Sequence, residues 1–156
     1  ASPQERQQPI DEIASDLAYG FCPLFLAGQF SLTAPQLAER GFGSAVQRQP
    51  HPRFGEISLV SAIRPDGELA FGGVPGRACS VVVSGARREA ALARLRQTMT
   101  WTGLDFQPTA NVGQDLPGVT VETFKAPVES QMLYVQLIQT SGPASAVVAQ
   151  LFAMDN

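Results

Sequence analysis

The two cysteines are the residues whose chemistry follows most directly from the sequence. Cys22 and Cys79 are the only cysteines of the chain, and each lies in an apolar stretch. An even number of cysteines is typical of a disulfide formed in an oxidising compartment. A nucleophilic cysteine would instead need an exposed thiolate and a nearby base, which apolar surroundings do not favour. We therefore predict a structural disulfide that closes a long loop and contributes about 4 kcal/mol of stability.

His51 is the only histidine, and it stands between two prolines in a segment without hydrophobic periodicity, residues 43–53. A single histidine without spare cysteines does not supply the ligand set of a structural zinc, so we expect no metal site. A histidine base needs an acidic partner and a nucleophile, and no motif such as G-x-S-x-G places them. We interpret His51 as part of an exposed loop. The alternative is a small hydrolase or transferase in which folding brings a serine or aspartate to His51.

Three arginines form the other candidate site. Arg77 follows a glycine-rich turn at residues 72–76, which lacks the lysine of a phosphate-binding loop and resembles no cofactor fingerprint. Arg87 and Arg88 lie in the first turn of a predicted helix, where positive charge opposes the helix dipole. Such a basic corner could hold a carboxylate or phosphate group of a ligand. The alternative is that these arginines are solvated or paired with Glu89.

Composition and charge narrow the functional classes. The net charge is −3 and there is no basic run, which argues against nucleic-acid binding. The sequence starts with Ala-Ser-Pro-Gln, as expected after removal of a signal peptide. The longest apolar run, residues 17–28, is interrupted by Gly20 and Pro23 and is shorter than the roughly 20 residues that span a bilayer. We therefore expect a periplasmic or secreted protein with no membrane span in this chain.

Helix signals occur in three places. We expect residues 1–9 to be a flexible arm, followed by a single α+β domain over residues 10–156. Apolar residues at helical spacing predict a first helix from Pro9 that kinks or stops between Gly20 and Pro23. A second, short helix has Thr33 as its predicted N-cap, in a capping box with a glutamine, and ends at Gly41.

The third predicted helix runs from a cap at Ser84 to about residue 100, with Leu92, Leu95 and Met99 facing inward. Four large aromatic residues that follow it could line a pocket, but large aromatic residues are more often found in cores, and we interpret them as core residues. They are Trp101, Phe106, Phe124 and Tyr134.

Strand signals fall in two groups of three. Residues 54–71 alternate in hydrophobicity around the turn Arg64-Pro65-Asp66-Gly67, which predicts a hairpin. On its first strand, Ile57, Leu59, Ser61 and Ile63 share one face. The second predicted turn, at residues 72–76, leads into a third strand that contains Cys79. Three more strands are predicted at residues 119–125, 132–140 and 146–154, with a turn at 141–143 between the last two.

The elements predict an α+β fold with helices packed on one face of an antiparallel sheet of five to six strands, in the order α-α-β-β-β-α-β-β-β. Because no catalytic or cofactor motif is found, binding is favoured over catalysis. The leading hypothesis is an exported, non-enzymatic accessory or interaction protein, such as a small subunit of a larger envelope complex.

Its predicted partner is another envelope protein, which would bind an edge strand at residues 146–154 through an exposed Val147, Leu151 and Phe152. A carrier of a small anionic ligand, held by Arg77, Arg87 and Arg88, is a further alternative.

Overall fold

The fold is an antiparallel sheet with helices on one face. The computed structural model describes residues 9–43, 45–51, 55–65, 67–109, 119–140 and 145–155. Within them, eight strands pair in the order β1-β2-β3-β4-β8-β7-β6-β5. The strands are β1 (Gln47–His51), β2 (Gly55–Arg64), β3 (Gly67–Val74), β4 (Ala78–Ser84), β5 (Gln107–Thr109), β6 (Val119–Val128), β7 (Gln131–Thr140) and β8 (Ala146–Asp155). The α+β class and the antiparallel sheet are thus as predicted.

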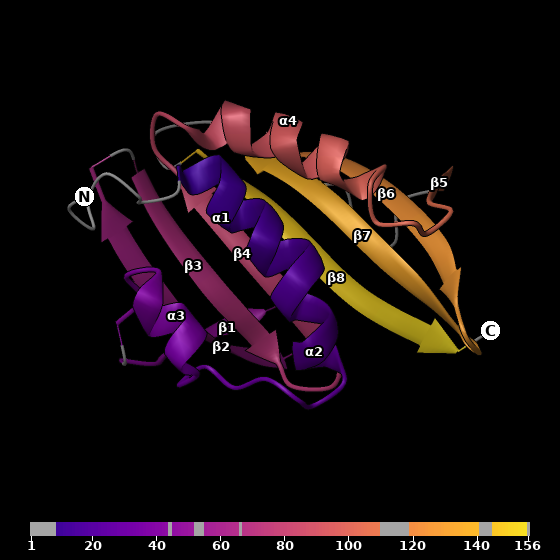
Figure 1. Cartoon of the computed structure of the whole chain (residues 1–156), viewed down its shortest axis with the longest axis horizontal. Coiled ribbons are helices and arrows are strands. Elements are labelled where there is room, and N and C mark those ends of the chain that lie inside the picture. The colour runs from indigo at the N-terminus through magenta and orange to yellow at the C-terminus, as the bar shows by residue number, and fades with distance from the viewer. Residues whose placement is uncertain are drawn as a thin grey trace.

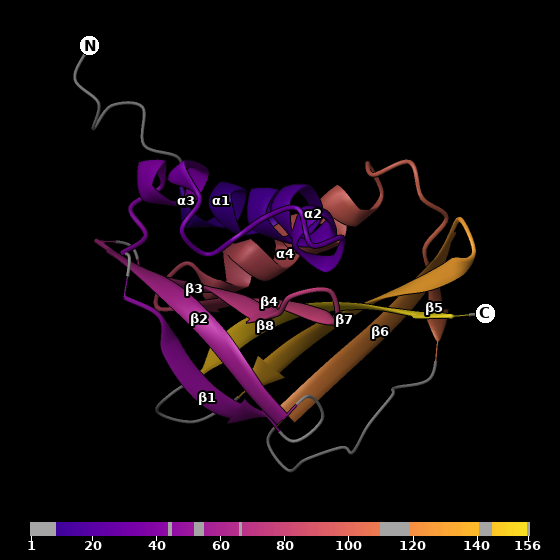
Figure 2. The same ribbon diagram turned by 90° about the horizontal axis from the view of Figure 1, so that it is seen from below.

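The N-terminal helical segments and the last helix lie side by side over the middle of the sheet, and one short helix lies apart from them toward the first strands (Figure 1). The helices are α1 (Ile10–Asp16), the π-helix η2 (Leu17–Phe21), α2 (Cys22–Leu26), α3 (Pro35–Glu39) and α4 (Arg88–Met99). Figure 2 shows the described helices on one face of a strongly twisted sheet, as the sequence predicts. Each half of the chain therefore contributes helical segments followed by four strands, and β4 and β8 pair where the halves meet.

The prediction of five to six strands was wrong because it missed the two edge strands. Residues 43–53 were expected to be a loop, yet β1 lies within them and pairs with β2 from Gln47↔Leu59 to His51↔Gly55. Its residues are polar on both faces, so no alternation marks the strand. β5 is only three residues long. Both strands form because a long neighbouring strand offers backbone hydrogen bonds, which the sequence of β1 or β5 does not reveal.

Of the predicted kink or stop between Gly20 and Pro23, the stop was wrong, and the helix instead becomes irregular there as a π-helix. It continues through η2 into α2, and the backbone N–H of Cys22 donates to the carbonyl of Leu17 across the wide turn. Pro23 has no N–H to donate to the carbonyl four residues before it. The turn before it is a π-turn, in which the backbone N–H bonds to the carbonyl five residues earlier instead of four. This widened turn sets the direction of the side chains at Tyr19 and Cys22, both of which are used in contacts described below.

Both predicted N-caps were wrong. The N-cap of α3 is Ala34, followed by a proline, and Thr33 instead interacts with the hydroxyl of Ser31. α4 begins after Arg87, since Ser84 is still part of β4 and pairs with Ala146. The predicted end of the second helix at Gly41 is confirmed. α3 ends just before this glycine, which has a φ of 90°.

The inward face of α4 is as predicted, with Leu92, Leu95 and Met99 buried. In the first hairpin, Ile57, Leu59, Ser61 and Ile63 share a face, but Val60 and Ala62 on the other face pack into the main core with the helices. Ile63 is 82% exposed. Apolar residues occur on both sides of β2, so alternation alone does not identify the side that the helices cover.

The glycines at the end of β3 are strand residues, which corrects the predicted turn at residues 72–76. Gly72 pairs with Leu59 and Ser80, and the turn itself is at residues 75–77. A Cβ at Gly72 would lie 1.9 Å from the carbonyl oxygen of Ser58, and one at Gly73 would lie 2.2 Å from that of Ala78. Glycine is therefore required here by the close approach of the neighbouring backbones.

The last strand, β8, is not an edge strand, which corrects a central expectation. It lies between β4 and β7. Val147, Leu151 and Phe152 are all buried. The strand therefore cannot bind a partner through a free edge or through these three side chains, because both of its edges are already paired.

Three further predictions fall on residues outside the described part of the chain. These are residues 1–8 of the arm predicted over residues 1–9, residue 66 of the first hairpin turn, and the turn at residues 141–143. The flanking strands of that first hairpin pair up to Arg64↔Gly67, and β7 and β8 pair from Gln131↔Asp155 to Gln139↔Val147. Both hairpins are thus present as predicted.

Candidate functional site

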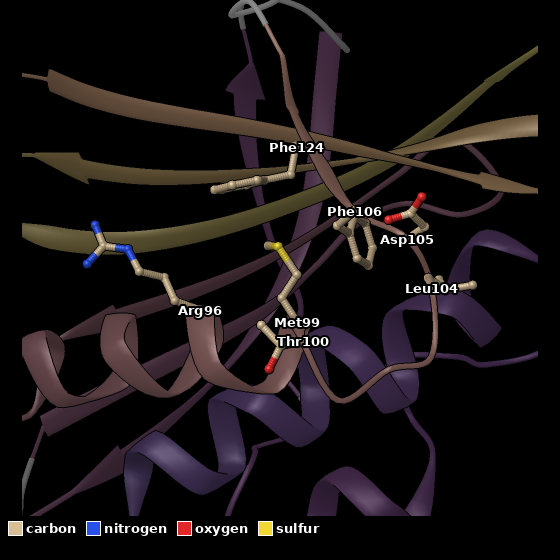
Figure 3. Close-up of a pocket in the computed structure, with 7 residues that line it drawn as sticks. All are labelled: Arg96, Met99, Thr100, Leu104, Asp105, Phe106 and Phe124. Atoms are coloured by element: carbon tan, nitrogen blue, oxygen red, sulfur yellow. The ribbon is translucent and has the colours of Figure 1, made fainter.

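A pocket of about 400 Å³ lies between the last turn of α4 and strand β6. Its lining residues come from α4, from the segment that follows it and from β6: Arg96, Met99, Thr100, Leu104, Asp105, Phe106 and Phe124. In Figure 3 the Met99 side chain points from the helix toward the rings of Phe106 and Phe124. We call this site the α4–β6 pocket.

The pocket forms because α4 ends before it covers β6. Met99 is the last helical residue, and the Thr102 hydroxyl donates to its carbonyl, which closes the helix end. The chain then leaves the helix and enters β5, which pairs with β6 only over Thr123 to Lys125. Phe124, on the helix-covered face of β6, is consequently only half-buried although it packs against the core.

An ion pair bridges α4 and β6 at one side of the pocket. Arg96 Nε donates to Glu122 Oε2 at 3.1 Å, and a second guanidinium nitrogen contacts the same oxygen. Because the two charges compensate each other, Arg96 offers little net charge to a ligand. The other carboxylate at the pocket, Asp105, is exposed and accepts a hydrogen bond from Gln107 Nε2 at 2.7 Å.

The lining of the pocket is mainly apolar. Its floor consists of Met99, Phe106 and Phe124, which offer dispersion contacts and aromatic faces. The hydroxyl of Thr100 already donates to the Gln97 carbonyl at 2.7 Å. Nucleophilic catalysis needs a nucleophile hydrogen-bonded to a base, and the seven lining residues contain no histidine, cysteine or lysine.

The predicted aromatic set is divided between the two faces of the sheet. Phe106 and Phe124 line the pocket, whereas Tyr134 lies on the opposite face and stacks on Phe152 with ring centroids 5.2 Å apart. Trp101, which follows the pocket residue Thr100, is 65% exposed. Treating all four as core residues was therefore wrong for Trp101. Its position just beyond a helix end is the sequence signal that distinguishes it.

The three arginines of the predicted anion site are not brought together. Arg77 precedes β4 and Arg87 and Arg88 follow it, so the strand separates them by roughly 20 Å at about 3.3 Å per residue. Arg88 Nη1 donates to the Gly85 carbonyl at 2.9 Å. Arg87 pairs with the carboxylate of Asp11. Within this fold Arg87 connects two helices instead of facing a shared site with Arg77.

Asp11 is a buried acid that the sequence did not single out. It is 7% exposed, and its second oxygen lies 3.6 Å from Arg94 Nη2. Burial alone would raise the pKa of its carboxyl, but the hydrogen bond from Arg87 and the positive charges of Arg87 and Arg94 lower that pKa below its ordinary value. This cluster ties the start of α1 to α4 at the end of the helix opposite the α4–β6 pocket.

The predicted disulfide is confirmed. Cys22 and Cys79 are bonded at an S–S distance of 2.04 Å and are both fully buried, with Cα atoms 5.5 Å apart. The bond joins the first residue of α2 to β4. Since neither sulfur is a free thiol, the alternative of a nucleophilic cysteine does not apply.

Tyr19 provides a second link, between the N-terminal helical segment and α4. Its hydroxyl donates to the Leu95 carbonyl of α4 at 2.9 Å, and burial raises the pKa of the phenol well above its ordinary value. Tyr19 therefore stays neutral and acts as a hydrogen-bond donor that joins η2 to α4.

His51 is the last residue of β1, where its backbone pairs with Gly55. Its side chain lies outside the described part of the structure, so catalysis through His51 stays a prediction. Among the side chains that are described, no cluster of three or more His, Cys, Asp or Glu residues could hold a metal ion. None of the described helices has the length and apolar character needed to cross a bilayer.

Comparisons with known proteins identify no relative of this chain. No protein-family model matches the chain, and no curated protein and no solved structure is similar to it at a significant level.

Proposed function

We propose that this protein is an exported, non-catalytic interaction protein that holds an apolar side chain of an envelope partner in the α4–β6 pocket. The observation that carries the proposal is an exposed apolar surface beside a preformed pocket. Trp101 is 65% and Leu104 is 36% exposed, and the pocket floor next to them is apolar. Exposed aromatic residues around an apolar depression are typical of protein contact sites.

The disulfide supports export. It closes a loop with a sequence separation of 57 and joins the helical layer to the sheet. Such bonds form and persist in oxidising compartments and are rare in the cytosol. The same bond is therefore expected to form in the periplasm or outside the cell.

The edges of the sheet do not favour a partner that adds a strand. Both edge strands contain a proline, Pro50 in β1 and Pro108 in β5. Proline has no N–H to donate to an added strand and is a common means of blocking edge pairing. The side of the sheet near β5 is thus expected to bind a partner through side chains in the pocket rather than through its backbone.

Site-specific photo-crosslinking in intact cells tests the proposal. A photoreactive amino acid at position 104 should give a discrete cross-linked product with an envelope protein. The matched control is position 63, where Ile63 is also apolar and is 82% exposed but lies in the other half of the sheet. Thr100→Trp, which places a large ring at the pocket, should reduce the product at position 104 at least fivefold.

Equal labelling of the same proteins from positions 104 and 63 would contradict the proposal, as would a product at 104 that Thr100→Trp does not affect. Export is tested separately by thiol titration of the denatured, unreduced protein taken directly from cells. We expect no free thiol, and two free thiols would contradict export.

A further inference from the structure

The charges around the α4–β6 pocket indicate which side chain chemistry it accepts. We infer that the pocket takes an aromatic side chain whose neighbour in the partner is a lysine or arginine. This inference rests on the proposed function and adds the charge of the partner segment to it.

The charged lining residues of the pocket, Arg96 and Asp105, differ in whether they have an ion-pair partner. Arg96 is paired with Glu122, so their charges compensate each other. Asp105 is the remaining charged lining residue, and the hydrogen bond that the structure gives it comes from the neutral amide of Gln107. Lys125 of β6 lies across from Gln107, but among the described residues no ion pair joins a cation to Asp105. A carboxylate without an ion pair therefore stands at a site whose floor is apolar, and a cationic group nearby is favoured over a neutral or anionic one.

The arrangement of the side chains places this carboxylate beside the apolar floor. Asp105 directly precedes Phe106 in the chain, and Figure 3 shows the carboxylate next to the Phe106 ring, on the side away from Arg96. An aromatic ring that enters between Met99, Phe106 and Phe124 would carry the adjacent residue of its chain toward Asp105. The sulfur of Met99 gives a favourable contact with such a ring.

The size of the pocket is consistent with one aromatic side chain and part of its neighbour. Its volume of about 400 Å³ is near the lower end of the range for small-molecule sites. A whole folded element does not fit in that volume. An exposed aromatic residue in a loop or terminus of the partner, flanked by a basic residue, does.

Titration of the full chain with three capped dipeptides tests the inference, with backbone amide NMR shifts as the readout. The probes are lysyl-phenylalanine, glutaminyl-phenylalanine and glutamyl-phenylalanine, which share the ring and differ in charge. We expect shifts at Met99, Leu104 and Phe124, with the lysyl peptide binding about fivefold more tightly than the glutaminyl peptide, as for a partly exposed ion pair. The glutamyl peptide should bind most weakly.

Asp105→Asn should reduce the affinity for the lysyl peptide to that for the glutaminyl peptide and leave the latter unchanged. The matched control is Glu68→Gln, an exposed acid on β3 in the other half of the sheet, which should change neither affinity.

Equal affinities for the three peptides at the pocket would overturn the inference about charge while leaving the proposed apolar contact in place. Shifts confined to residues outside the pocket would overturn the inference altogether. The proposed function fails by a different result, namely cross-linking that does not distinguish positions 104 and 63.

Discussion

The helices meet the sheet in two regions that differ in how completely they are filled. Under η2 and α2, Phe71 of β3 contacts Phe25 and Phe30 edge to face, at centroid distances of 5.7 and 5.8 Å, beside the buried disulfide. At the far end of α4, the comparable region over Phe124 holds a pocket. Both halves of the chain place helical segments before four strands, yet only the first half continues its helix far enough to cover its strands.

The difference shows how a small change in a helix end creates a site. In the first half, the π-turn lets the helix pass Pro23 and carry Cys22 and Phe25 onto the sheet. In the second half, α4 ends at Met99 and the next residues turn outward, with Trp101 in solvent. The filled region is expected to supply stability and the open region to supply binding. Four predictions test this division.

Loss of the disulfide should have the largest effect. Replacing both Cys22 and Cys79 with alanine should lower the free energy of unfolding by about 4 kcal/mol, because the unfolded chain regains the freedom of a long loop. Urea denaturation of the variant and of the native protein measures the difference. Reduction of the native protein with dithiothreitol is the control and should give a similar loss. A loss below about 1 kcal/mol would mean that packing alone holds the filled region together.

A matched pair of leucine substitutions compares the two regions directly. Leu95→Ala should cost about 3 kcal/mol, since Leu95 is fully buried and its removal leaves a cavity. Leu104→Ala, at the pocket, should cost less than about 0.5 kcal/mol because that side chain is already partly in water. Thermal and urea unfolding of both variants provide the measurement. Equal costs would show that the pocket is as much a part of the stabilising core as the buried contacts of Leu95.

The Asp11 cluster should make stability depend on pH. Asp11→Asn should cost about 2 kcal/mol at pH 7, less than a fully buried pair because the arginines are partly exposed. The pKa of Asp11 is lowered in the folded state, so its contribution is complete above the unfolded pKa of about 4 and is lost as pH falls through the lower folded value. The cost of the substitution should therefore shrink below about pH 4. A cost that stays constant from pH 7 to pH 2 would exclude this role for Asp11.

The exposed tryptophan should matter least for stability and most for binding. Trp101→Ala should change the free energy of unfolding by less than about 0.5 kcal/mol, because the side chain is mainly in solvent. It should nevertheless weaken cross-linking from position 104 by about tenfold, as expected for an aromatic anchor at a contact site. Ile63→Ala is the control and should affect neither measurement. An unfolding loss above 1.5 kcal/mol would identify Trp101 as a core residue after all.

The candidate site could be predicted only in its parts. Phe106 and Phe124 were interpreted as core residues, and their place in the pocket beside Met99 depends on where α4 ends and on how β5 pairs with β6. The three arginines, by contrast, were predicted to share a site and are kept apart by the fold. Arg77 and Arg87 are near each other in the sequence, yet a strand between them carries them to opposite ends of the sheet. Proximity along the chain is therefore a poor guide to a shared site when an extended segment intervenes.

What the sequence determined by itself was local. Alternating apolar residues identified β2, β3 and the three C-terminal strands, helical spacing identified the buried face of α4, and two cysteines in apolar segments identified the disulfide. Each of these depends on neighbours a few residues away, or on simple counting. Tertiary structure alone decided that β8 is central, that β1 and β5 are strands, and that a pocket opens beside Phe124. These features depend on backbone hydrogen bonds and burial between segments far apart in the chain, and no local pattern encodes them.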